Sequence, residues 1–407
     1  MTKLEQLINE LCPNGVEYRT LGEIAVDVFR GAGIKRDEVT ETGIPCVRYG
    51  EIYTTYGVWF DECVSHTVLE NVPSPKYFEH GDILFAITGE SVEDIAKSCA
   101  YVGHEKCLAG GDIVVLKHNQ NPKYLAYALS TTDAQMQKSK GKVKSKVVHS
   151  SVPAIKEIVV PIPPLPVQSE IVCILDNFTE LTAELTAELT ARKKQYEYYK
   201  SYLFEDTSSH KKATTKDVTT DRFWLMPATP KYIPEGVPYI TSKNVRNGCV
   251  DFNDVKYISE KDYLEISKNR SIETNDLLIT MIGTIGEAAF VGENTRFYGQ
   301  NIYLIRFDES VCLRKYFYYF LSSENIKNSL VSKKNASSQG YIKAGSIDNL
   351  EFPLPSIDEQ ERIVAILDRF DTLCNDISTG LPAGIEARQK QYEYYRDKLL
   401  AFKEKVN

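Results

Sequence analysis

The sequence repeats itself at a distance of 192 residues, and this duplication constrains the fold more than any other feature. Residues 161–178 (PIPPLPVQSEIVCILDNF) align without a gap on residues 353–370 (PLPSIDEQERIVAILDRF), and nine of the eighteen positions are identical. The tail RKKQYEYY at 192–199 recurs as RQKQYEYY at 388–395, and PKYLAYALS at 122–130 corresponds to RKYFYYFLS at 314–322. A repeat of this length is typical of a duplicated domain and is too long for a solenoid.

Each copy begins as a mixed domain and ends as a helix. Short β-like runs such as 112–116 (DIVVL) and 301–305 (NIYLI), separated by Gly, Pro and Asn, predict an α+β first part. After a proline-rich hinge, apolar residues recur every three or four positions, which predicts a long helix that packs on another helix. We expect an α+β fold with two mixed α/β domains separated by a long antiparallel helical coiled-coil pair, in a pseudo-twofold internal duplication. The expected mixed domains are 1–165 and 207–355, and the helical regions are 166–206 and 356–407.

The second predicted helix is interrupted. Gly380, Pro382 and Gly384 break its pattern, and Pro382 suits the first turn of a restarted helix. We expect twofold symmetry to fail at this point. The predicted apolar seam of the two helices consists of Ile171, Ile174, Phe178, Leu181, Leu185, Leu189, Tyr196, Tyr199, Leu203, Ile363, Ile366, Phe370, Leu373, Ile377, Tyr392, Tyr395, Leu399 and Phe402.

The first helix carries a tandem four-residue repeat, LTAELTAEL, at 181–189. Ala, Glu and Leu are strong helix formers, and four residues advance a helix by about 6 Å. For stability, this segment is a solvated helix with ordinary leucine spacing. For function, we interpret the repeat as a ruler between the two mixed domains.

Composition and motifs argue against a catalytic or membrane role. With 43% hydrophobic residues, 26% charged residues and a net charge of −8, the chain is an ordinary globular protein. Glu5 and Glu10 interrupt the first fifteen residues and no apolar run spans a bilayer, so we expect a cytoplasmic protein. The sequence lacks a Gly-x4-Gly-Lys-Ser/Thr loop and paired histidine ligands. The NPKY run at 121–124 resembles the Asn-Pro-Pro-Tyr motif of amino-methyltransferases but lacks its second proline. We expect no catalytic residue, metal site or cofactor in this chain.

Two lysine-bearing segments occupy corresponding places in the two copies. The first is QKSKGKVKSK at 137–146, with five lysines at alternate positions, and the second is SKKNASSQGYIK at 332–343. Alternate lysines of an extended segment share one face, where they suit the phosphates of a polyanion, and polar neighbours can contact base edges. The candidate DNA-binding residues are Lys138, Lys140, Lys142, Lys144, Lys146, Gln300, Lys333, Lys334, Ser337, Ser338, Gln339, Tyr341 and Lys343.

The sequence allows two alternatives for this surface and adds one expectation. A lysine run is often only a solvated loop, and Gln300 is equally suited to a structural amide role. Residues 51–94 hold nine acids against Lys76 alone, so we expect that segment to face away from a polyanion.

With these motifs, the chain closely resembles the specificity (S) subunits of type I DNA restriction–modification systems, over its whole length. The hinge-and-helix segments, the two tyrosine-rich tails and the tandem Thr-Ala-Glu-Leu carry the resemblance, and the tandem repeat is similar to that of the type IC branch. The resemblance implies a non-catalytic subunit whose two target-recognition domains each read half of a bipartite site in double-stranded DNA. Because the two domains differ widely outside the shared motifs, the implied site is asymmetric.

The resemblance also implies protein partners. Two methyltransferase subunits dock on the helices, restriction subunits join where they are present, and these partners bind S-adenosylmethionine, ATP and Mg. Packing accounts for most of the apolar seam, so we expect docking on the exposed positions beside it. The rival interpretations are a coiled-coil scaffold that binds proteins without DNA readout and a self-sufficient modification enzyme, which would need a methyl-donor pocket.

Overall fold

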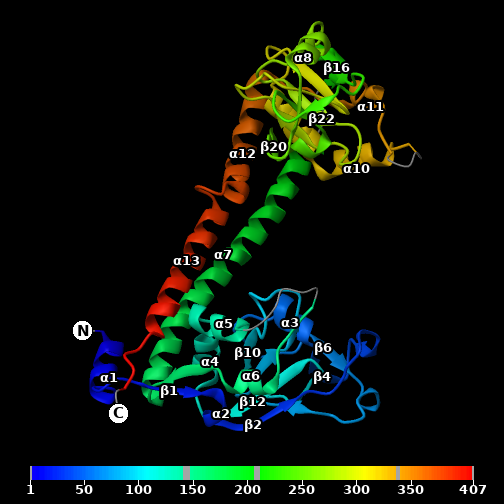
Figure 1. Ribbon diagram of the computed structural model, residues 1–407. Helices are drawn as coiled ribbons and strands as arrows, with labels where there is room; N and C mark the ends of the chain where they lie inside the picture. The colour runs from blue at the N-terminus through cyan, green and yellow to red at the C-terminus, as the bar shows by residue number, and fades with distance from the viewer. Residues whose placement is uncertain (1, 141–146, 206–210, 336–339, 406–407) are drawn as a thin grey trace. The chain divides into compact units, whose positions relative to one another are not determined.

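The computed structural model describes residues 2–140, 147–205, 211–335 and 340–405 (Figure 1). The chain divides into two compact units. Unit 1 comprises Met1–Glu184 with Ile385–Asn407, and unit 2 comprises Leu185–Gly384. The division falls within the tandem four-residue repeat, so the predicted domain boundaries at residues 165, 206 and 355 stay predictions.

Unit 1 is built on two five-stranded sheets. The main sheet has the order β2 (Ala25–Arg30), β12 (Ile113–His118), β8 (Ile83–Ala86), β10 (Ser98–Tyr101) and β5 (Trp59–Phe60). The second has the order β3 (Val39–Thr40), β6 (Ser65–Thr67), β4 (Ile44–Val47), β11 (Cys107–Ala109) and β7 (Tyr77–Phe78). All residues of β8 and β10 are buried, because they lie at the centre of a sheet covered on both faces.

Two short pairs and six helices complete the globular part of unit 1. The antiparallel pairs are β1 (Glu17–Thr20) with β14 (Val159–Ile162), and β9 (Thr88–Gly89) with β13 (Val148–His149). The helices are α1 (Lys3–Leu11), α2 (Leu21–Ile24), α3 (Tyr49–Thr54), α4 (Pro122–Leu129), α5 (Thr132–Ser139) and α6 (Val152–Lys156).

Unit 2 repeats this plan. Its main sheet has the order β16 (Thr219–Leu225), β25 (Ile302–Phe307), β22 (Leu277–Thr280), β23 (Ala288–Phe290), β20 (Gly248–Val250) and β19 (Val245–Arg246). The first five strands match the main sheet of unit 1 in order. The second sheet has four strands, β17 (Tyr232–Ile233), β21 (Lys256–Ile258), β18 (Val237–Ile240) and β24 (Tyr298–Gly299), and β15 (Lys212–Thr214) pairs with β26 (Glu351–Pro353). The helices are α8 (Glu260–Ser267), α9 (Arg314–Ser322), α10 (Glu324–Ser332) and α11 (Ala344–Asp348).

Three long helices join the two plans: α7 (Leu165–Glu205), α12 (Ile357–Asn375) and α13 (Leu381–Leu399). In unit 1, Phe178 of α7 stacks on Tyr395 of α13, with ring centroids 5.5 Å apart. In unit 2, Phe370 of α12 meets Tyr199 of α7 at 5.6 Å. The hinge end of the helix in each copy therefore packs on the tyrosine-rich tail of the other copy. Helix α7 takes part at both ends because it continues for 41 residues without a break.

The ends of the chain take part in unit 1. Val16 forms a parallel bridge with Glu404, and the Tyr18 hydroxyl donates to Phe402 O at 3.0 Å. The segment after α13 thus lies beside the start of β1. In unit 2 the chain itself leads from α7 to the corresponding strand β15.

The predictions of two α+β domains, of long helices and of a break in the second helix are confirmed. Pro382 is the second residue of α13, and Gly380 lies where a Cβ would come within 2.5 Å of Thr372 O. Two seam assignments are wrong: Leu181 is 45% exposed and Ile377 is 80% exposed. Ile377 follows the end of α12, so helical spacing does not apply to it. No helix in the described ranges is both long and apolar enough to cross a membrane.

Candidate nucleic-acid interface

The two lysine-bearing segments begin and end at equivalent places in the two units. The first follows α5 and returns at β13, which pairs with β9. The second follows α10 and returns at Tyr341, which forms an antiparallel bridge with Ile282. Thr88 of β9 and Ile282 each lie two residues beyond the central strand, β8 or β22. The described residues Val148–His149 in unit 1 and Tyr341 in unit 2 therefore pair just beyond the same end of the same central strand.

Lys138 is buried, so the prediction that it binds DNA is wrong. Its side chain is inside unit 1, and its ammonium group donates to Leu129 O at 2.7 Å and to Ser98 Oγ at 3.2 Å. Residues 132–139 form helix α5, in which positions two apart do not share a face as they would in a strand. Burial lowers the pKa of Lys138 to about 7. Leu330 occupies the corresponding position of α10 and is also buried.

The other lysines of the first segment lie at or beyond the end of α5. Lys140 is the C-cap residue of α5 and is exposed, so it stays a candidate for phosphate contact. Lys142, Lys144 and Lys146 lie outside the described residues. Glu90 directly follows β9 and is exposed. The pairing of β9 with β13 places Gly89 beside Val148, close in sequence to both segments. The expectation that acidic residues 51–94 face away from a polyanion stays a prediction.

The lysine-bearing segment of unit 2 contains three exposed lysines. Lys333 is the C-cap residue of α10, Lys334 follows it, and Lys343 is the N-cap residue of α11. None of the three forms an ion pair with a carboxylate in the part of the chain that the structure describes. Uncompensated cations at one edge create a positive potential that attracts a polyanion. Ser337, Ser338 and Gln339 lie outside the described residues.

Tyr341 and Gln300 are half-buried and held by the fold. The ring of Tyr341 lies 6.2 Å from that of Trp224. The Oε1 atom of Gln300 accepts hydrogen bonds from the hydroxyls of Thr229 at 3.2 Å and of Tyr239 at 3.4 Å. The structural amide role of Gln300 is thus occupied through its oxygen, and its amide nitrogen is the part that could reach a base.

The NPKY run has a structural role. Asn121 is the N-cap residue of α4, and its side-chain oxygen accepts a hydrogen bond from the backbone N–H of Tyr124 at 3.2 Å. Pro122 occupies the first position of the helix, where its missing N–H has no cost. The motif therefore begins a helix, and the Asn121 side-chain oxygen, the Lys123 ammonium and the Tyr124 hydroxyl bond within unit 1.

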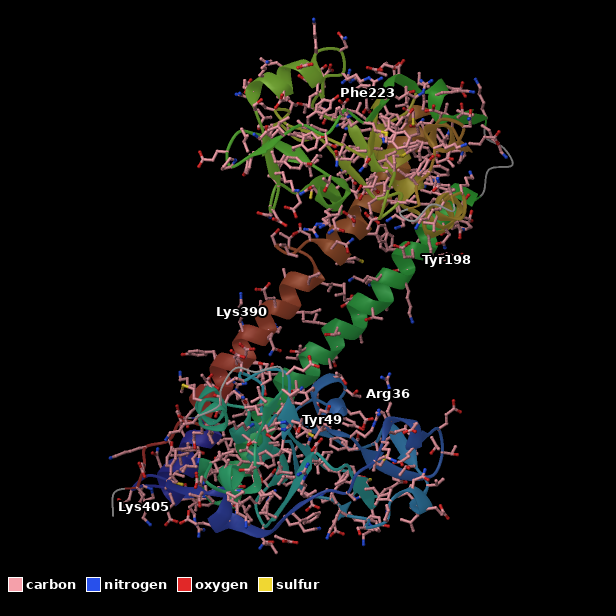
Figure 2. The ribbon with its side chains drawn as sticks, turned by 45° about the vertical axis from the view of Figure 1, so that its right-hand side comes forward. Arg36, Tyr49, Tyr198, Phe223, Lys390 and Lys405 are labelled. Carbon is pink, nitrogen blue, oxygen red and sulfur yellow. The ribbon has the colours of Figure 1, made fainter. Side chains whose placement is uncertain are left out.

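The exposed faces of the long helices carry tyrosines. Tyr198 and Tyr202 of α7 are 62% and 50% exposed and stack on each other at 5.9 Å, and Tyr394 of α13 is 60% exposed. Tyr198 is labelled on its helix in Figure 2. Four of the predicted seam residues are buried in the cores of their own units, where packing accounts for them: Ile171, Tyr196, Ile363 and Tyr392. The seam residues Ile174, Phe178, Leu185, Leu189, Tyr199, Leu203, Ile366, Phe370, Leu373, Leu399 and Phe402 are half-buried, whereas Tyr395 is exposed.

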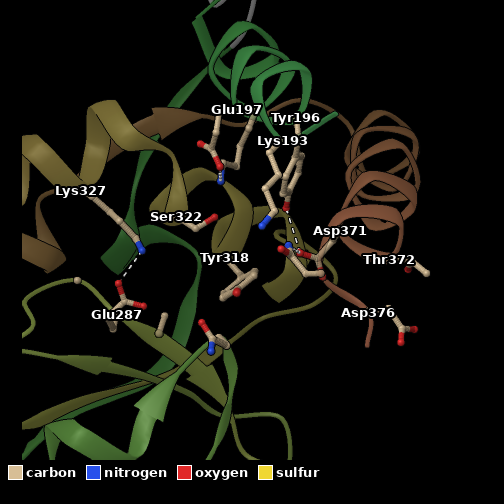
Figure 3. Close-up of a pocket in the computed structure, with 15 residues that line it drawn as sticks. Lys193, Tyr196, Glu197, Glu287, Tyr318, Ser322, Lys327, Asp371, Thr372 and Asp376 are labelled. Carbon is tan, nitrogen blue, oxygen red and sulfur yellow. Dashed lines mark hydrogen bonds and ion pairs between the residues drawn. The ribbon is translucent and has the colours of Figure 1, made fainter. Parts of the chain in front are cut away.

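A polar cleft of about 810 Å³ lies in unit 2 between α7, α9, α10 and the end of α12 (Figure 3). Two of its lysines pair with carboxylates that also line it. Lys327 binds Glu287 at 2.8 Å, and Lys200 binds Glu197 at 2.7 Å. Burial raises the pKa of Tyr318, which also lines the cleft, to about 12, so its hydroxyl stays protonated. Lys193 is the third lysine that lines the cleft. Among the described residues, no three His, Cys, Asp or Glu side chains are grouped to hold a metal ion.

Sequence reasoning missed the side chains that join each globular part to its hinge helix. Asp176 of α7 binds Lys123 and Tyr127 of α4, and Asp368 of α12 binds the corresponding lysine and tyrosine of α9. The signal was present, because Asp176 and Asp368 are one of the nine identical pairs in the best-matching segment. The role of this identical pair could be recognised only once the structure showed that α4 and α9 lie against the hinge helices.

The sequence matches a family described as the type I restriction modification DNA specificity domain, over residues 13–192 and 225–387. It is 38% identical over 276 residues to a putative type I restriction enzyme specificity subunit of Haemophilus influenzae, covering 64% of this chain and 68% of that protein. It is 36% identical over 296 residues to the EcoR124I/EcoR124II specificity subunit of Escherichia coli, covering 69% of this chain and 70% of that protein.

The fold also resembles a solved structure from work on complex assembly and conformational transition of the type I R-M system. The TM-score is 0.68 with 15% sequence identity, and the match covers 95% of this chain and 98% of that one. At this identity the likeness concerns the fold alone.

Proposed function

The chain belongs to the family of type I restriction–modification DNA specificity subunits, and from this premise we propose that unit 1 and unit 2 each read one half of a bipartite DNA site. The family supplies DNA sequence recognition to the restriction–modification complex and is non-catalytic. One observation supports the proposal: the two units share an order of five strands, and in each the chain next to the lysine-bearing segment pairs just beyond the same end of the same central strand. A repeated scaffold with a repeated cationic segment suits a site made of two half-sites.

The two half-sites differ in sequence. The second sheet has five strands in unit 1 and four in unit 2. Among the described lysines of the two segments, Lys140 is exposed in unit 1, whereas Lys333, Lys334 and Lys343 are exposed in unit 2. In each unit the lysines hold phosphates, which supplies affinity without sequence selection. Polar side chains of the same segments select bases in the major groove.

Helix α7 sets the distance between the half-sites. It is continuous for 41 residues, about 60 Å at 1.5 Å per residue, and contributes to both units. Each Thr-Ala-Glu-Leu unit in it adds about 6 Å, compared with 3.4 Å per base pair.

The exposed tyrosines of α7 and α13 form the docking surface for two methyltransferase subunits, which carry S-adenosylmethionine. Tyr198 and Tyr394 occupy corresponding places in the two tyrosine-rich tails, so each unit offers a similar contact. Aromatic side chains that are partly apolar and bear a hydroxyl are favoured at protein interfaces. Restriction subunits, with ATP and Mg, join the same assembly in the cytoplasm.

The proposal is tested by mapping N6-methyladenine in cells that express the chain together with its methyltransferase subunits. The expected result is one asymmetric motif with two defined half-sites and a fixed spacer. A second measurement exchanges residues 212–353 for those of a relative with another specificity, which should change one half-site and keep the other. Methylation at sites without two defined halves, or loss of both half-sites on exchange, would contradict the assignment of one half-site to each unit.

A further inference from the structure

One carboxylate in each unit ties a helix of the globular part to the hinge helix. In unit 1, Lys123 binds Asp176 at 2.8 Å, and the Tyr127 hydroxyl donates to the same carboxylate at 2.7 Å. In unit 2, Lys315 binds Asp368 at 2.8 Å, and the Tyr319 hydroxyl donates to it. All three positions shift by 192 residues between the copies.

A second set of bonds reinforces each attachment at the start of the hinge helix. The Gln168 side chain is buried, accepts a hydrogen bond from Asn121 N at 2.9 Å and donates to Pro163 O at 2.8 Å. Gln360 is also buried, and it makes the equivalent bonds with Leu313 N at 2.9 Å and Pro355 O at 3.0 Å. Each globular part is therefore held to its hinge helix at two levels about two turns apart.

The two attachments differ in one partner. In unit 1, Trp59 Nε1 donates to Asp176 at 3.2 Å, and the Lys123 ammonium lies 3.5 Å from the centre of the Trp59 ring. By strand register the corresponding residue of unit 2 is Cys249, which is exposed. Asp368 is accordingly more exposed than Asp176, with side-chain exposures of 37% and 19%.

We propose that Asp176 and Asp368 are positioning residues that fix the orientation of each DNA-reading part on its hinge helix and thereby restrict the spacer to one length. This rests on the proposed function. A compact unit of about 190 residues has a radius of gyration of about 16 Å. A rotation of about 12° about the carboxylate would move a loop at that radius by about 3 Å, close to one base-pair step of 3.4 Å. An ion pair and a tyrosine hydrogen bond to one carboxylate oppose that rotation, because both must break or stretch.

The test uses Asp176→Asn, Asp368→Asn and the double variant in the assembled methyltransferase. The matched controls are Glu180→Gln on α7 and Glu361→Gln on α12, which remove the same charge from exposed positions of the same helices. Methylation mapping should show unchanged half-site sequences. The share of methylated sites whose spacer differs by one base pair should rise at least tenfold in each Asp→Asn variant and not in the controls. The rise should be larger for Asp368→Asn, because Trp59 still supports unit 1.

A purely structural role predicts a different result. General destabilisation would lower methylation at all sites together and leave the spacer distribution narrow, which would overturn the proposal if the variants fold. If an Asp→Asn variant fails to assemble, Lys123→Gln and Lys315→Gln remove only the ion pair, and the same spacer readout decides. A wild-type protein without any bipartite motif would instead contradict the proposed function, so the two failures are distinguishable.

Discussion

Replacement of Lys138 by leucine should change how the stability of unit 1 depends on pH. The Lys138 side chain is 4% exposed, and its donors are satisfied by Leu129 O and Ser98 Oγ. Burial lowers its pKa from 10.5 to about 7. Leu330 stands at the same position of α10, so leucine is compatible with this packing.

The direction in which stability changes with pH follows from proton linkage. The folded state holds the proton less tightly than the unfolded state, so unfolding takes up a proton between pH 7 and 10.5. Stability of the wild type therefore rises with pH in this window, and the cost of the buried charge is complete below about pH 7. The full difference corresponds to about 5 kcal/mol. Of this, about 2 kcal/mol is regained between about pH 7 and pH 9, equivalent to about 4–8 °C in Tm for a unit of this size.

The chain offers a convenient probe. It has two tryptophans, Trp59 in unit 1 and Trp224 in unit 2. In a Trp224→Phe background, tryptophan fluorescence reports on unit 1, and urea unfolding with and without Lys138→Leu is measured from pH 6 to pH 9. The difference in unfolding free energy between the two proteins removes the contributions of all other titrating groups. The wild type should gain about 2.5 kcal/mol relative to the variant across this range, most of it above pH 7.

A constant difference across the same range would refute the reasoning, because it would mean that Lys138 keeps its charge and its water in the folded protein. A constant offset added to the predicted slope is allowed, since leucine leaves Leu129 O and Ser98 Oγ without a donor, at about 1–3 kcal/mol each. Lys140→Leu is the control, because it makes the same replacement at an exposed lysine two residues away.

Three further outcomes are expected. Insertion of one Thr-Ala-Glu-Leu unit after Leu189 should widen the spacer in the methylation map by about one to two base pairs, since α7 lengthens by about 6 Å, and an unchanged spacer would reject the ruler. Gln168→Leu should lower the Tm of unit 1 by at least about 4 °C, because it leaves the buried groups Asn121 N and Pro163 O unpaired; a change confined to unit 2 would contradict this. Alanine at Lys333, Lys334 and Lys343 of unit 2 should weaken binding to all DNA sequences. It should also reduce the slope of log affinity against log salt concentration by up to about 0.9 for each phosphate that is no longer neutralised. If mobility shifts at low and high salt give the wild-type affinity, these lysines are only solvated surface.

The sequence predicted the duplication, the mixed domains, the long helices and the break near Pro382 without any coordinates. Each of these is a pattern along the chain: identity at a constant shift, apolar spacing of three and four, or glycine and proline at particular positions. The resemblance to specificity subunits rests on the same patterns and is confirmed by the family match.

Which side chains face the core and which face solvent could not be predicted in the same way. Lys138 was assigned to a cationic surface because alternate lysines suggest an extended segment, but the start of that segment is helical and turns this side chain into the core. Leu181 lies within α7 and fits the helical spacing, and it is nevertheless exposed. Whether a side chain is buried depends on what packs against it, and spacing along one helix does not specify the partner.

The sequence by itself determined that one plan is used twice and that a helix with a four-residue repeat follows the first copy. Only the tertiary structure decided which tail packs on which hinge helix, and that Asp176 and Asp368 meet a lysine and a tyrosine about fifty residues earlier in the chain. The reason is physical: repeats and propensities are local properties of the chain, whereas ion pairs and buried hydrogen bonds form between segments that only the folded packing brings together.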